Sequence, residues 1–496
     1  MNIKNRYLVV IVLVAVLFGA TLTYTAMEVL DNKEAQVSEN NDSASNDDFG
    51  DLQASIEDTF PKDSVPELSK LMKAISIIQN NYVEDVDNAT LMEGAIKGML
   101  QELGDPHTVY MDVETADQFN DSLESSFEGI GAEVTMENGF VTIVAPIKGS
   151  PAEKAGLMPK DQIIKVDGES VEGLDLLEAV SKIRGEKGTT VTLHIQRPGV
   201  SKLIEVEVVR DEIPVETVYQ DVQTIDGKKT GIIEITSFAI DTAKDFNNAL
   251  KDLEEQGIEG LVIDVRGNPG GLFTSVEEIL KNFIPEDQPY VIFEMKDGEK
   301  QRFFSGTDEK KDYPISVLIN QGSASASEIL AAAMKEAGYD VIGEQSYGKG
   351  TVQKTISLGD GSNIKVTIYK WLTPSGEWIN EVGVTPTIET KQPDYFYTTP
   401  FEVEKGKSYK LDMASDEIAN IQKMLNGIGF ETGREDGYFD KKTEEAVSAF
   451  QAEYDLPVTG EIDTATGEKI QAAVIEDVRN PEKDLQLKKA MEELYK

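Results

Sequence analysis

Hydrophobic and polar positions divide the chain into segments of distinct type. Residues 7–26 are an apolar run broken only by Gly19 and three threonines. About 20 such residues are enough to span a bilayer as a helix. Lys4 and Arg6 precede the run, which predicts that the short N-terminal tail stays in the cytoplasm. We expect residues 1–30 to form an uncleaved signal anchor, with a cleaved signal peptide as the alternative, and the rest of the chain to be exported.

The next two segments are polar and then helical. Residues 31–55 are acidic and almost free of large apolar side chains, which predicts a flexible stalk. Within residues 56–126, apolar side chains recur every three or four positions from residue 64 to residue 104, as at Leu68, Leu71 and Ile75, and the pattern ends at Gly104-Asp105-Pro106. This spacing predicts an N-terminal helical region.

From residue 127 the pattern changes to short strands between glycines and prolines. The predicted strands are at 141–144, 163–166 and 191–195, with short helices at 150–155 and 174–183. Residues 127–212 are therefore expected to form a separate β-rich domain.

The second half of the chain combines an α/β pattern with a helical one. Residues 213–400 alternate between strand and helix, and their most apolar strands, 260–265 and 315–320, are of the fully buried type. Residues 414–475 are helical around a glycine-rich middle, and residues 476–496 are expected to form a helical tail, in which Pro481–Lys496 predicts a charged helix that packs on another part of the chain. The predicted fold class is a multidomain α/β protein.

Composition and charge exclude several classes of function. The 496 residues include 90 acidic and 47 basic side chains, a net charge of −43, which repels phosphate backbones and argues against nucleic-acid binding. The absence of cysteine excludes disulfides, thiol nucleophiles, iron–sulfur clusters and thiolate zinc sites. With only His107 and His194, the usual multi-histidine metal centres are excluded as well.

A candidate nucleophile follows one of the buried strands. Ser323–Glu328 opens an alanine-rich helix at a strand-to-helix turn. A serine in such a turn is exposed, and main-chain amides and the positive end of the helix point at its surroundings. Ser325 is therefore a candidate acyl-transfer nucleophile. The same residues allow a second interpretation, because Ser325 and Glu328 also have the spacing of a capping box.

A candidate base lies 24 residues after Ser325. Lys349 stands between two glycines, an unusual place for a solvated charge. To act as a base near neutral pH it must lose its proton, so burial must lower its pKa from about 10.4. Gln353 is placed to hydrogen-bond the amine without restoring its charge, as a carboxylate would.

The residues around the lysine also approximate a phosphate-binding P-loop, from Gly343 to Lys349. However, Gly350 stands where the magnesium-binding serine or threonine belongs, and the residues that follow predict a strand instead of a helix. Both differences argue against nucleotide binding.

A third segment, Asp264-Val265-Arg266-Gly267-Asn268-Pro269-Gly270-Gly271, comes at the end of a buried strand. Its glycines allow main-chain amides to face a pocket, which suits an oxyanion hole. A strand-end turn with an Asp264–Arg266 pair explains the same residues. Both interpretations can hold at once.

Together these segments resemble the C-terminal processing peptidases, or tail-specific proteases, a family of Ser–Lys endopeptidases. The match covers about residues 64–390 and includes Asp105-Pro106-His107 and Thr373-Pro374-Ser375-Gly376. The resemblance implies an α/β protease core with Ser325 as nucleophile, Lys349 as general base and Gln353 as orienting residue. It further implies an oxyanion hole built from the amide of Ala326 and one amide from Gly270 or Gly271, and it places His107 outside the site. The mechanism that it implies uses neither a metal nor another cofactor.

Residues 127–212 resemble a PDZ domain. The residues that carry the resemblance are Phe127-Glu128-Gly129-Ile130-Gly131-Ala132, Gly149-Ser150-Pro151-Ala152 and Asp161-Gln162-Ile163-Ile164-Lys165-Val166-Asp167-Gly168. The resemblance implies that a loop of Gly129, Ile130, Gly131 and Ala132 accepts a C-terminal carboxylate, and that an extended peptide pairs with the strand that follows. Arg184 is either a charge at a helix C-terminus or a contact that couples peptide occupancy to the catalytic domain.

Residues 414–475 resemble the three-helix peptidoglycan-binding domain of cell-wall enzymes. Asp436-Gly437-Tyr438-Phe439 and Leu456-Pro457-Val458-Thr459-Gly460 are among its marks. The resemblance implies binding to wall polymer. The alternative is a domain used for self-association, as in a homodimer.

The predicted function is that of an exported serine endopeptidase, anchored in the cell membrane by a single span with its catalytic domain on the wall side of a Gram-positive bacterium. Its expected substrates are exported or membrane proteins with apolar C-terminal tails, cleaved in general processing or in a signalling cut such as those of sporulation. The alternative is a catalytically silent, peptide-binding adaptor of the cell wall. The presence of Ser325, Lys349 and Gln353 argues against the adaptor.

Overall fold

The computed structural model describes residues 65–137, 139–174, 176–200, 202–305, 310–404 and 406–496. The predicted signal anchor and stalk lie outside these residues. Within them, no helix is both long and apolar enough to cross a membrane. The described residues divide into two units at Gly98/Met99, which are described separately.

The helical periodicity of the N-terminal region is confirmed. α3 spans Val65–Asn81 and α4 spans Asn88–Gln101. Asp87 stabilises the start of α4, because its carboxylate accepts the N–H of Thr90 at 2.7 Å. Ile75 is buried, whereas most other apolar side chains of the two helices stay partly or fully exposed.

The β-rich region has a sheet of antiparallel strands in the order β3-β4-β5-β7-β8, with β6 paired to β5. Its strands are β3 (Ala132–Glu137), β4 (Phe140–Pro146), β5 (Gln162–Val166), β6 (Glu169–Ser170), β7 (Thr190–Gln196) and β8 (Ile204–Val209). Its helices are α6 (Pro151–Lys154) and α7 (Leu176–Ile183). The alternation along β7 places Val191, Leu193 and Ile195 in the core, as its sequence predicted. The short pair β2 (Ser126–Gly129) and β9 (Asp211–Pro214) brings the two ends of the region side by side.

The α/β core is built on a sheet in the order β10-β11-β12-β15-β16-β19. β10 runs antiparallel to β11, and the other neighbouring pairs are parallel. The strands are β10 (Val218–Ile225), β11 (Lys228–Ile235), β12 (Gly260–Asp264), β15 (Ile315–Ile319), β16 (Asp340–Gly343) and β19 (Ile388–Glu389). Every residue of β12 and β15 is buried, which confirms the two strands predicted from their apolar sequences.

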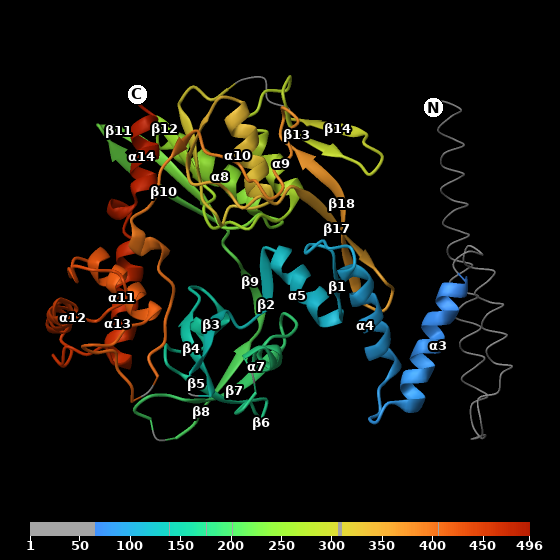
Figure 1. Cartoon of the computed structure of the whole chain (residues 1–496), viewed down its shortest axis with the longest axis horizontal. Helices are drawn as coiled ribbons and strands as arrows, with labels where there is room; N and C mark the ends of the chain where they lie inside the picture. The colour runs from blue at the N-terminus through green and yellow to red at the C-terminus, as the bar shows by residue number, and fades with distance from the viewer. Residues whose placement is uncertain (1–64, 138, 175, 201, 306–309, 405) are drawn as a thin grey trace. The chain divides into compact units, whose positions relative to one another are not determined.

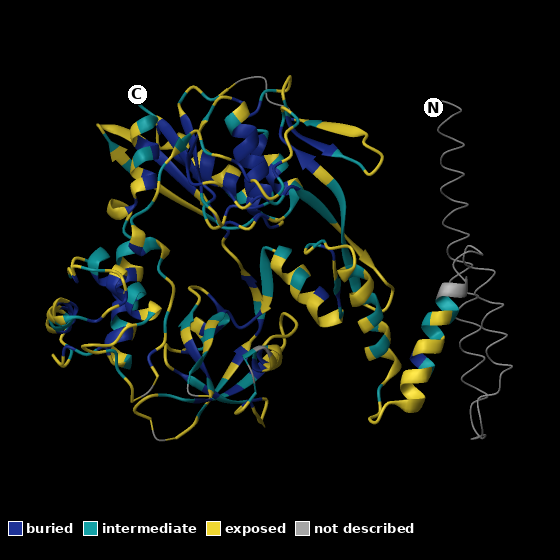
Figure 2. Cartoon of the chain, in the orientation of Figure 1, coloured by how far each residue is buried: buried dark blue, intermediate teal, exposed yellow. Residues whose placement is uncertain are grey.

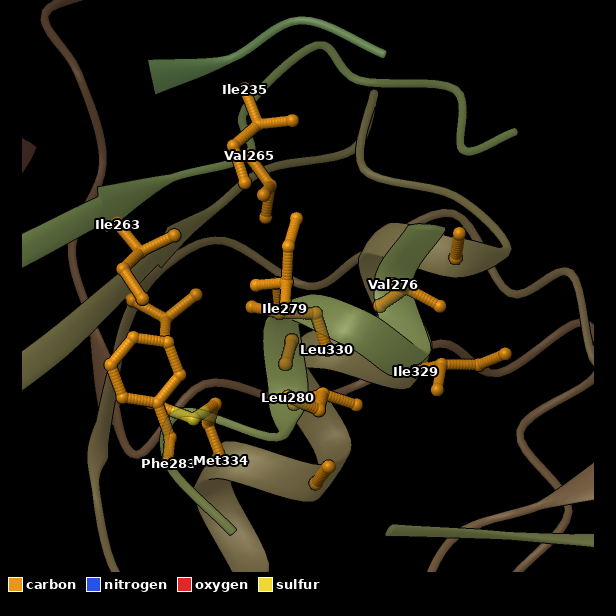
Figure 3. Packing of buried hydrophobic residues seen from close by; sticks show 14 of the residues in the cluster. Ile235, Ile263, Val265, Val276, Ile279, Leu280, Phe283, Ile329, Leu330 and Met334 are labelled. Atoms are coloured by element: carbon orange, nitrogen blue, oxygen red, sulfur yellow. The ribbon is translucent and has the colours of Figure 1, made fainter. Parts of the chain in front are cut away.

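Helices cover both faces of this sheet (Figure 1). α8 (Thr242–Glu255), α9 (Phe273–Leu280) and α10 (Ala326–Glu336) pack on one face, where most of the buried residues gather (Figure 2). Side chains of β11 and β12 meet those of α9 and α10 there (Figure 3). The C-terminal helix α14 (Leu485–Glu493) packs on the other face, against the alternate side chains of the same strands. Its packing agrees with the helix predicted for Pro481–Lys496, whereas residues 476–478 belong to α13 (Thr464–Val478).

A second, antiparallel sheet flanks the core. Its order is β1-β18-β13-β14, and β17 pairs with β18. The strands are β1 (Val109–Met111), β13 (Pro289–Glu294), β14 (Lys300–Phe304), β17 (Thr351–Ser357) and β18 (Asn363–Leu372). β1 was not indicated by the sequence pattern, whereas the helix that follows it, α5 (Val113–Leu123), falls inside the predicted helical region 56–126. The three residues of β1 are too few to show a periodicity, and their pairing with β18 joins segments far apart in the chain.

The C-terminal region confirms the predicted helical segment. Its elements are η1 (Asp394–Tyr397), α11 (Asp416–Gly427), α12 (Lys441–Glu453), α13 (Thr464–Val478) and η2 (Pro481–Lys483). Ser415, Asp440 and Asp463 each begin a helix by accepting a main-chain N–H with the side chain. The three α-helices enclose their own apolar core, with Phe439 and Phe450 at its centre.

Candidate active site

Ser325 lies at the start of α10, after the loop that follows β15. Its φ of 55° and ψ of −112° are values that an L-residue rarely adopts. Such a backbone costs about 1–3 kcal/mol and persists where the surrounding contacts hold it, often at active sites. Ala326 is the first helical residue, so its N–H has no acceptor within the helix. The predicted strand-to-helix turn is confirmed, and the strain of Ser325 is a further mark of a functional residue.

A buried carboxylate connects Ser325 to Lys349. The side chain belongs to Glu328, which is 0% exposed. Its Oε2 accepts the N–H of Ser325 and the N–H of Lys349, both at 2.8 Å. Its Oε1 accepts the N–H of Gly348 and the hydroxyl of Ser346, both at 2.6 Å. The capping-box bond expected from the sequence is present, and the same carboxylate also fixes the backbone of the lysine segment.

Close packing of the main chain explains why both neighbours of Lys349 are glycines. A Cβ on Gly350 would lie 2.7 Å from the main-chain nitrogen of Asn380, and one on Gly348 would lie 3.0 Å from main-chain nitrogens of the facing loop. The Lys349 carbonyl oxygen accepts the indole N–H of Trp371 at 2.7 Å. Because the main chain is packed this closely, the lysine side chain starts from a fixed position.

The pKa of Lys349 lies below its ordinary value of 10.5. Burial is the largest cause, and the positive charge of Lys365 acts in the same direction. The negative charges of Glu328 and Asp105 oppose the shift without reversing it. The amine therefore reaches its neutral form at a lower pH than an exposed lysine does, as a base requires.

One cavity of about 460 Å³ brings the predicted catalytic and oxyanion residues together. It is lined by Ser325, Lys349, Gln353, Ala326, Gly270 and Gly271. Apolar walls from α5, α9 and β17 surround them, including Phe119, Phe273 and Val352. Three segments that are distant in the sequence thus meet at one concave site.

Gln353 points its amide at two threonines. Its Nε2 donates to the hydroxyls of Thr351 at 2.9 Å and Thr367 at 3.1 Å. In the part of the chain that the structure describes, Gln353 makes no hydrogen bond to the Lys349 amine, which is the contact that the sequence predicted. Because the two threonines bind Nε2 of Gln353, its Oε1 is the atom available to accept a hydrogen bond from the Lys349 amine.

The loop after β12 brings two glycines against Ser325. A Cβ on Gly270 would lie 2.8 Å from the Cβ of Ser325, and its φ is 102°. The N–H of Gly270 is already used, because it donates to Oδ1 of Asn268 at 2.8 Å. Among the described residues, no acceptor is bonded to the N–H of Gly271. Of the two candidates, the geometry therefore favours Gly271 as the oxyanion donor beside Ala326.

The predicted peptide-binding loop lies outside this cavity, in the β-rich region. Gly129 ends β2 and Ala132 begins β3, the edge strand of its sheet. The carbonyl oxygen of Ile130 accepts the N–H of Ala152 at 2.8 Å. Gly131 has a φ of 72°, and a Cβ there would lie 2.5 Å from Ser150. The loop is thus a tight turn at the head of an edge strand.

Arg184, just after α7, contacts two side chains beyond its own helix. Its guanidinium donates to Asp121 of α5 at 2.7 Å and lies 5.1 Å from the ring centre of Phe127. α5 also contributes Phe119 and Leu123 to the cavity that Ser325 and Lys349 line. A helix-end charge alone does not account for these contacts.

The sequence did not predict that three further residues lie near Lys349, and the family resemblance placed one of them, His107, outside the site. Asp105, His107 and Lys365 lie close enough to Lys349 for their charges to interact with it. Burial, and then the charge of Lys349, lowers the pKa of His107. The pairing of β1 with β18 brings these residues there, and no local pattern revealed it. Among the described residues, no cluster of three or more His, Asp or Glu side chains is placed to hold a metal ion.

The charges around Lys349 predict a shift in the pH profile. If the neutral amine is the active form, kcat/KM rises with pH through the lowered pKa of Lys349. Replacing Lys365 with methionine removes a like charge, so this pKa rises and the profile moves to higher pH. Asp105→Asn removes an opposite charge and moves the profile to lower pH. Peptide cleavage rates between pH 6 and 10 test both shifts, and equal shifts in the same direction would contradict this account.

Comparison with known families agrees with the segments described above. Residues 229–390 match peptidase family S41, residues 129–208 match the PDZ domain, and residues 414–470 match a peptidoglycan binding domain. Residues 16–115 match the N-terminal domain of the activating protease CtpB.

Individual relatives are proteases of the same type. The carboxy-terminal processing protease CtpB of Bacillus subtilis is 48% identical over 99% of this chain and 99% of its own length. Carboxy-terminal processing protease CtpA of the same bacterium is 42% identical over 86% of this chain and 90% of its own. Among solved structures, the photosystem II D1 C-terminal processing protease is 27% identical, covers 69% of this chain and 92% of its own, and has a TM-score of 0.41. The chain therefore belongs to the carboxy-terminal processing serine proteases of peptidase family S41, with an added PDZ domain and a peptidoglycan-binding domain.

Proposed function

We propose that this protease cleaves peptide bonds with Ser325 as nucleophile and Lys349 as general base. The observation that carries the proposal is the meeting, in one cavity, of a strained serine at a helix start and a partly buried lysine of lowered pKa. Glu328 supports both, since it bonds the main chain of each.

In the proposed reaction, the neutral Lys349 amine accepts the Ser325 hydroxyl proton while the serine oxygen attacks the scissile carbonyl carbon. The N–H groups of Ala326 and Gly271 stabilise the resulting oxyanion. The lysine ammonium then gives its proton to the leaving amine, which leaves an ester on Ser325. A water molecule, deprotonated by the same amine, hydrolyses this ester and restores the serine. The Gln353 amide oxygen accepts a bond from the amine and orients it without holding its charge.

The PDZ domain is the proposed site for the substrate's C-terminus. Gly129, Ile130, Gly131 and Ala132 form a turn before the edge strand β3, where an extended tail can add as a further strand. The Arg184–Asp121 contact supports a role for Arg184 in coupling tail binding to the catalytic cavity, because α5 lines that cavity. An apolar tail matches the apolar walls around Ser325.

The proposed location is the outer face of the cell membrane, with residues 1–30 as the anchor and the catalytic part on the wall side of a Gram-positive bacterium. The apolar run of the N-terminus supports this location. The domain at 414–470 would then hold the protease on peptidoglycan, or join two copies in a homodimer. A processing or signalling cut, such as one in sporulation, is the proposed physiological role.

Cleavage of an exported, unstructured protein tests this function. The full chain in detergent is incubated with such a protein bearing an apolar C-terminal tail, and with a matched protein whose last three residues are aspartates. Mass spectrometry should find internal cleavage of the first protein, at least tenfold slower cleavage of the second, and none by Ser325→Ala. Cleavage that persists in Ser325→Ala would exclude the proposed nucleophile, and equal cleavage of both proteins would exclude recognition of the tail.

A further inference from the structure

The start of the C-terminal helix α14 is bonded to the loop that carries the candidate oxyanion glycine. Arg266 of this loop donates to both carboxylate oxygens of Asp484, from Nη1 at 3.0 Å and from Nη2 at 2.7 Å. Its Nη1 also donates to Oε1 of Gln486 at 3.0 Å. Nε and Nη2 donate to Asp264, at the end of β12, at 2.9 and 2.6 Å. The guanidinium is thus held between the strand that precedes the loop and a helix more than 200 residues further along the chain.

The side chains of Asp484 and Gln486, which bond Arg266, are both buried. Asp484 is 9% exposed and Gln486 is 1% exposed. Asp484 also begins α14, because its Oδ1 accepts the N–H of Leu487 at 2.9 Å. Burial alone would raise the pKa of Asp484, but the hydrogen bonds and charge of Arg266 outweigh it and lower the pKa. The carboxylate is therefore charged at neutral pH, and its two oxygens fit the fork of the guanidinium.

The loop next to Arg266 holds the serine segment directly. Gly267 donates its N–H to the side chain of Asn320 at 2.8 Å. The carbonyl oxygen of Asn268 accepts the N–H of Ala324 at 3.0 Å and the hydroxyl of Ser327 at 2.9 Å. The Asn268 side chain fixes Gly270, as described above. A displacement of Arg266 would therefore move both candidate oxyanion donors, the N–H of Gly271 and the N–H of Ala326.

A second connection leads from Asp484 toward the lysine segment. Gln392 donates to Asp484 at 2.6 Å, and its main-chain N–H donates to the hydroxyl of Tyr397 at 2.8 Å. That hydroxyl donates to Glu344, just after β16, at 2.6 Å. Glu344 begins the segment that leads to Lys349. The loop that carries Arg266 and the segment that leads to Lys349 are thus both connected by hydrogen bonds to the first turn of α14.

We propose that Asp484 and Gln486 are positioning residues for catalysis: α14 acts as a clasp that fixes Arg266 and, through it, the amide donors for the oxyanion. This inference rests on the proposed function, because it assumes that Gly271 and Ala326 supply those donors. It assigns a catalytic consequence to a helix that lies beyond the peptidoglycan-binding domain in the chain. The domain between β19 and α14 is then tethered to the protease core at both of its ends.

Asp484→Asn tests the clasp with little change of shape. Asparagine still begins a helix well, but it loses the charge and one of the two acceptors for Arg266. Asp463→Asn is the matched control, because Asp463 begins α13 in the same way and contacts Thr466 instead of the loop. The full chain in detergent is assayed with a fluorogenic peptide, active sites are counted with a fluorophosphonate, and melting temperatures are recorded.

We expect kcat per active site to fall about tenfold to a hundredfold in Asp484→Asn, less than for outright loss of an oxyanion donor, with KM within about twofold. Asp463→Asn should keep the kcat of the parent. Asp484→Asn should lose more melting temperature than Asp463→Asn, because it also weakens the buried ion pair with Arg266. Arg266→Lys should lower kcat as well, and adding Asp484→Asn to it should change little further, because both act through one contact.

Two results would contradict the proposed positioning role of Asp484 and Gln486. A kcat per active site in Asp484→Asn equal to that of Asp463→Asn would show that α14 serves stability alone. Fully additive effects of Arg266→Lys and Asp484→Asn would show that the two residues act independently. Ser325→Ala in the same assay separates this failure from that of the proposed function, since activity in Ser325→Ala would remove the catalytic assignment itself.

Discussion

Replacing Lys349 with methionine is expected to lower kcat about a thousandfold or more at every pH from 6 to 9. Methionine has a similar length but no proton acceptor for the Ser325 hydroxyl. The lysine side chain lines the cavity, and its main chain is held by Glu328 and Trp371, so the loss should reflect chemistry and not misplacement. Steady-state cleavage of a fluorogenic peptide by the full chain measures the effect.

Lys354→Met is the matched control for this prediction, because Lys354 is an exposed lysine on the same strand, β17. Its kcat should stay within about twofold of the parent, as for most exposed substitutions. The rise of activity with pH should persist in Lys354→Met and vanish from the residual activity of Lys349→Met. A Lys349→Met variant that keeps the pH profile of the parent would exclude the lysine as base.

Glu328→Gln is expected to cause the second large effect, on activity and stability together. The carboxylate accepts four hydrogen bonds without being exposed to water. The amide nitrogen of glutamine is a donor, so it would face main-chain N–H groups on one side and leave them unsatisfied. Each buried unsatisfied group costs about 1–3 kcal/mol, so we expect a loss of about 2–6 kcal/mol of unfolding free energy. Because Ser325 and Lys349 share this carboxylate, kcat should fall about a hundredfold in the fraction that remains folded.

The control for Glu328→Gln lies on the same helix. Glu336 is exposed near the end of α10, and Glu336→Gln should change the unfolding free energy by no more than about 0.5 kcal/mol. Urea unfolding and active-site counting separate the two effects. If folded Glu328→Gln cleaved peptide at the rate of the parent, the carboxylate would have no part in aligning the serine and the lysine.

Much of the fold could be predicted from the sequence because its core elements carry strong local signals. The buried strands β12 and β15 have purely apolar sequences, and the strand β7 alternates with the period of a half-buried sheet. The turn at Ser325 was visible as a strand followed by an alanine-rich helix. Its strained backbone was not, since the strain depends on Gly270 and Glu328 packing around it.

The other contacts of the site depend on pairings distant in the chain, which one sequence does not reveal. The spacing of Ser325 and Glu328 predicted a helix cap, and the bonds of Glu328 to Gly348 and Lys349 became visible only in the fold. The helix α14 was expected to pack elsewhere in the chain, but its partner Arg266 could not be named. Gln353 was predicted as a neighbour of the lysine amine, yet the tertiary structure gives its amide nitrogen to two threonines.

Labelling with a fluorophosphonate tests the central claim most directly, because the reagent reports the nucleophile and its base without any assumption about the substrate. The full chain is labelled between pH 6 and 10, and the modified peptide is identified by mass spectrometry. We expect one adduct, on Ser325, which forms faster as the pH rises through the lowered pKa of Lys349 and does not form in Lys349→Met. An adduct on another serine, such as Ser346, or unchanged labelling of Ser325 in Lys349→Met would contradict the Ser–Lys assignment.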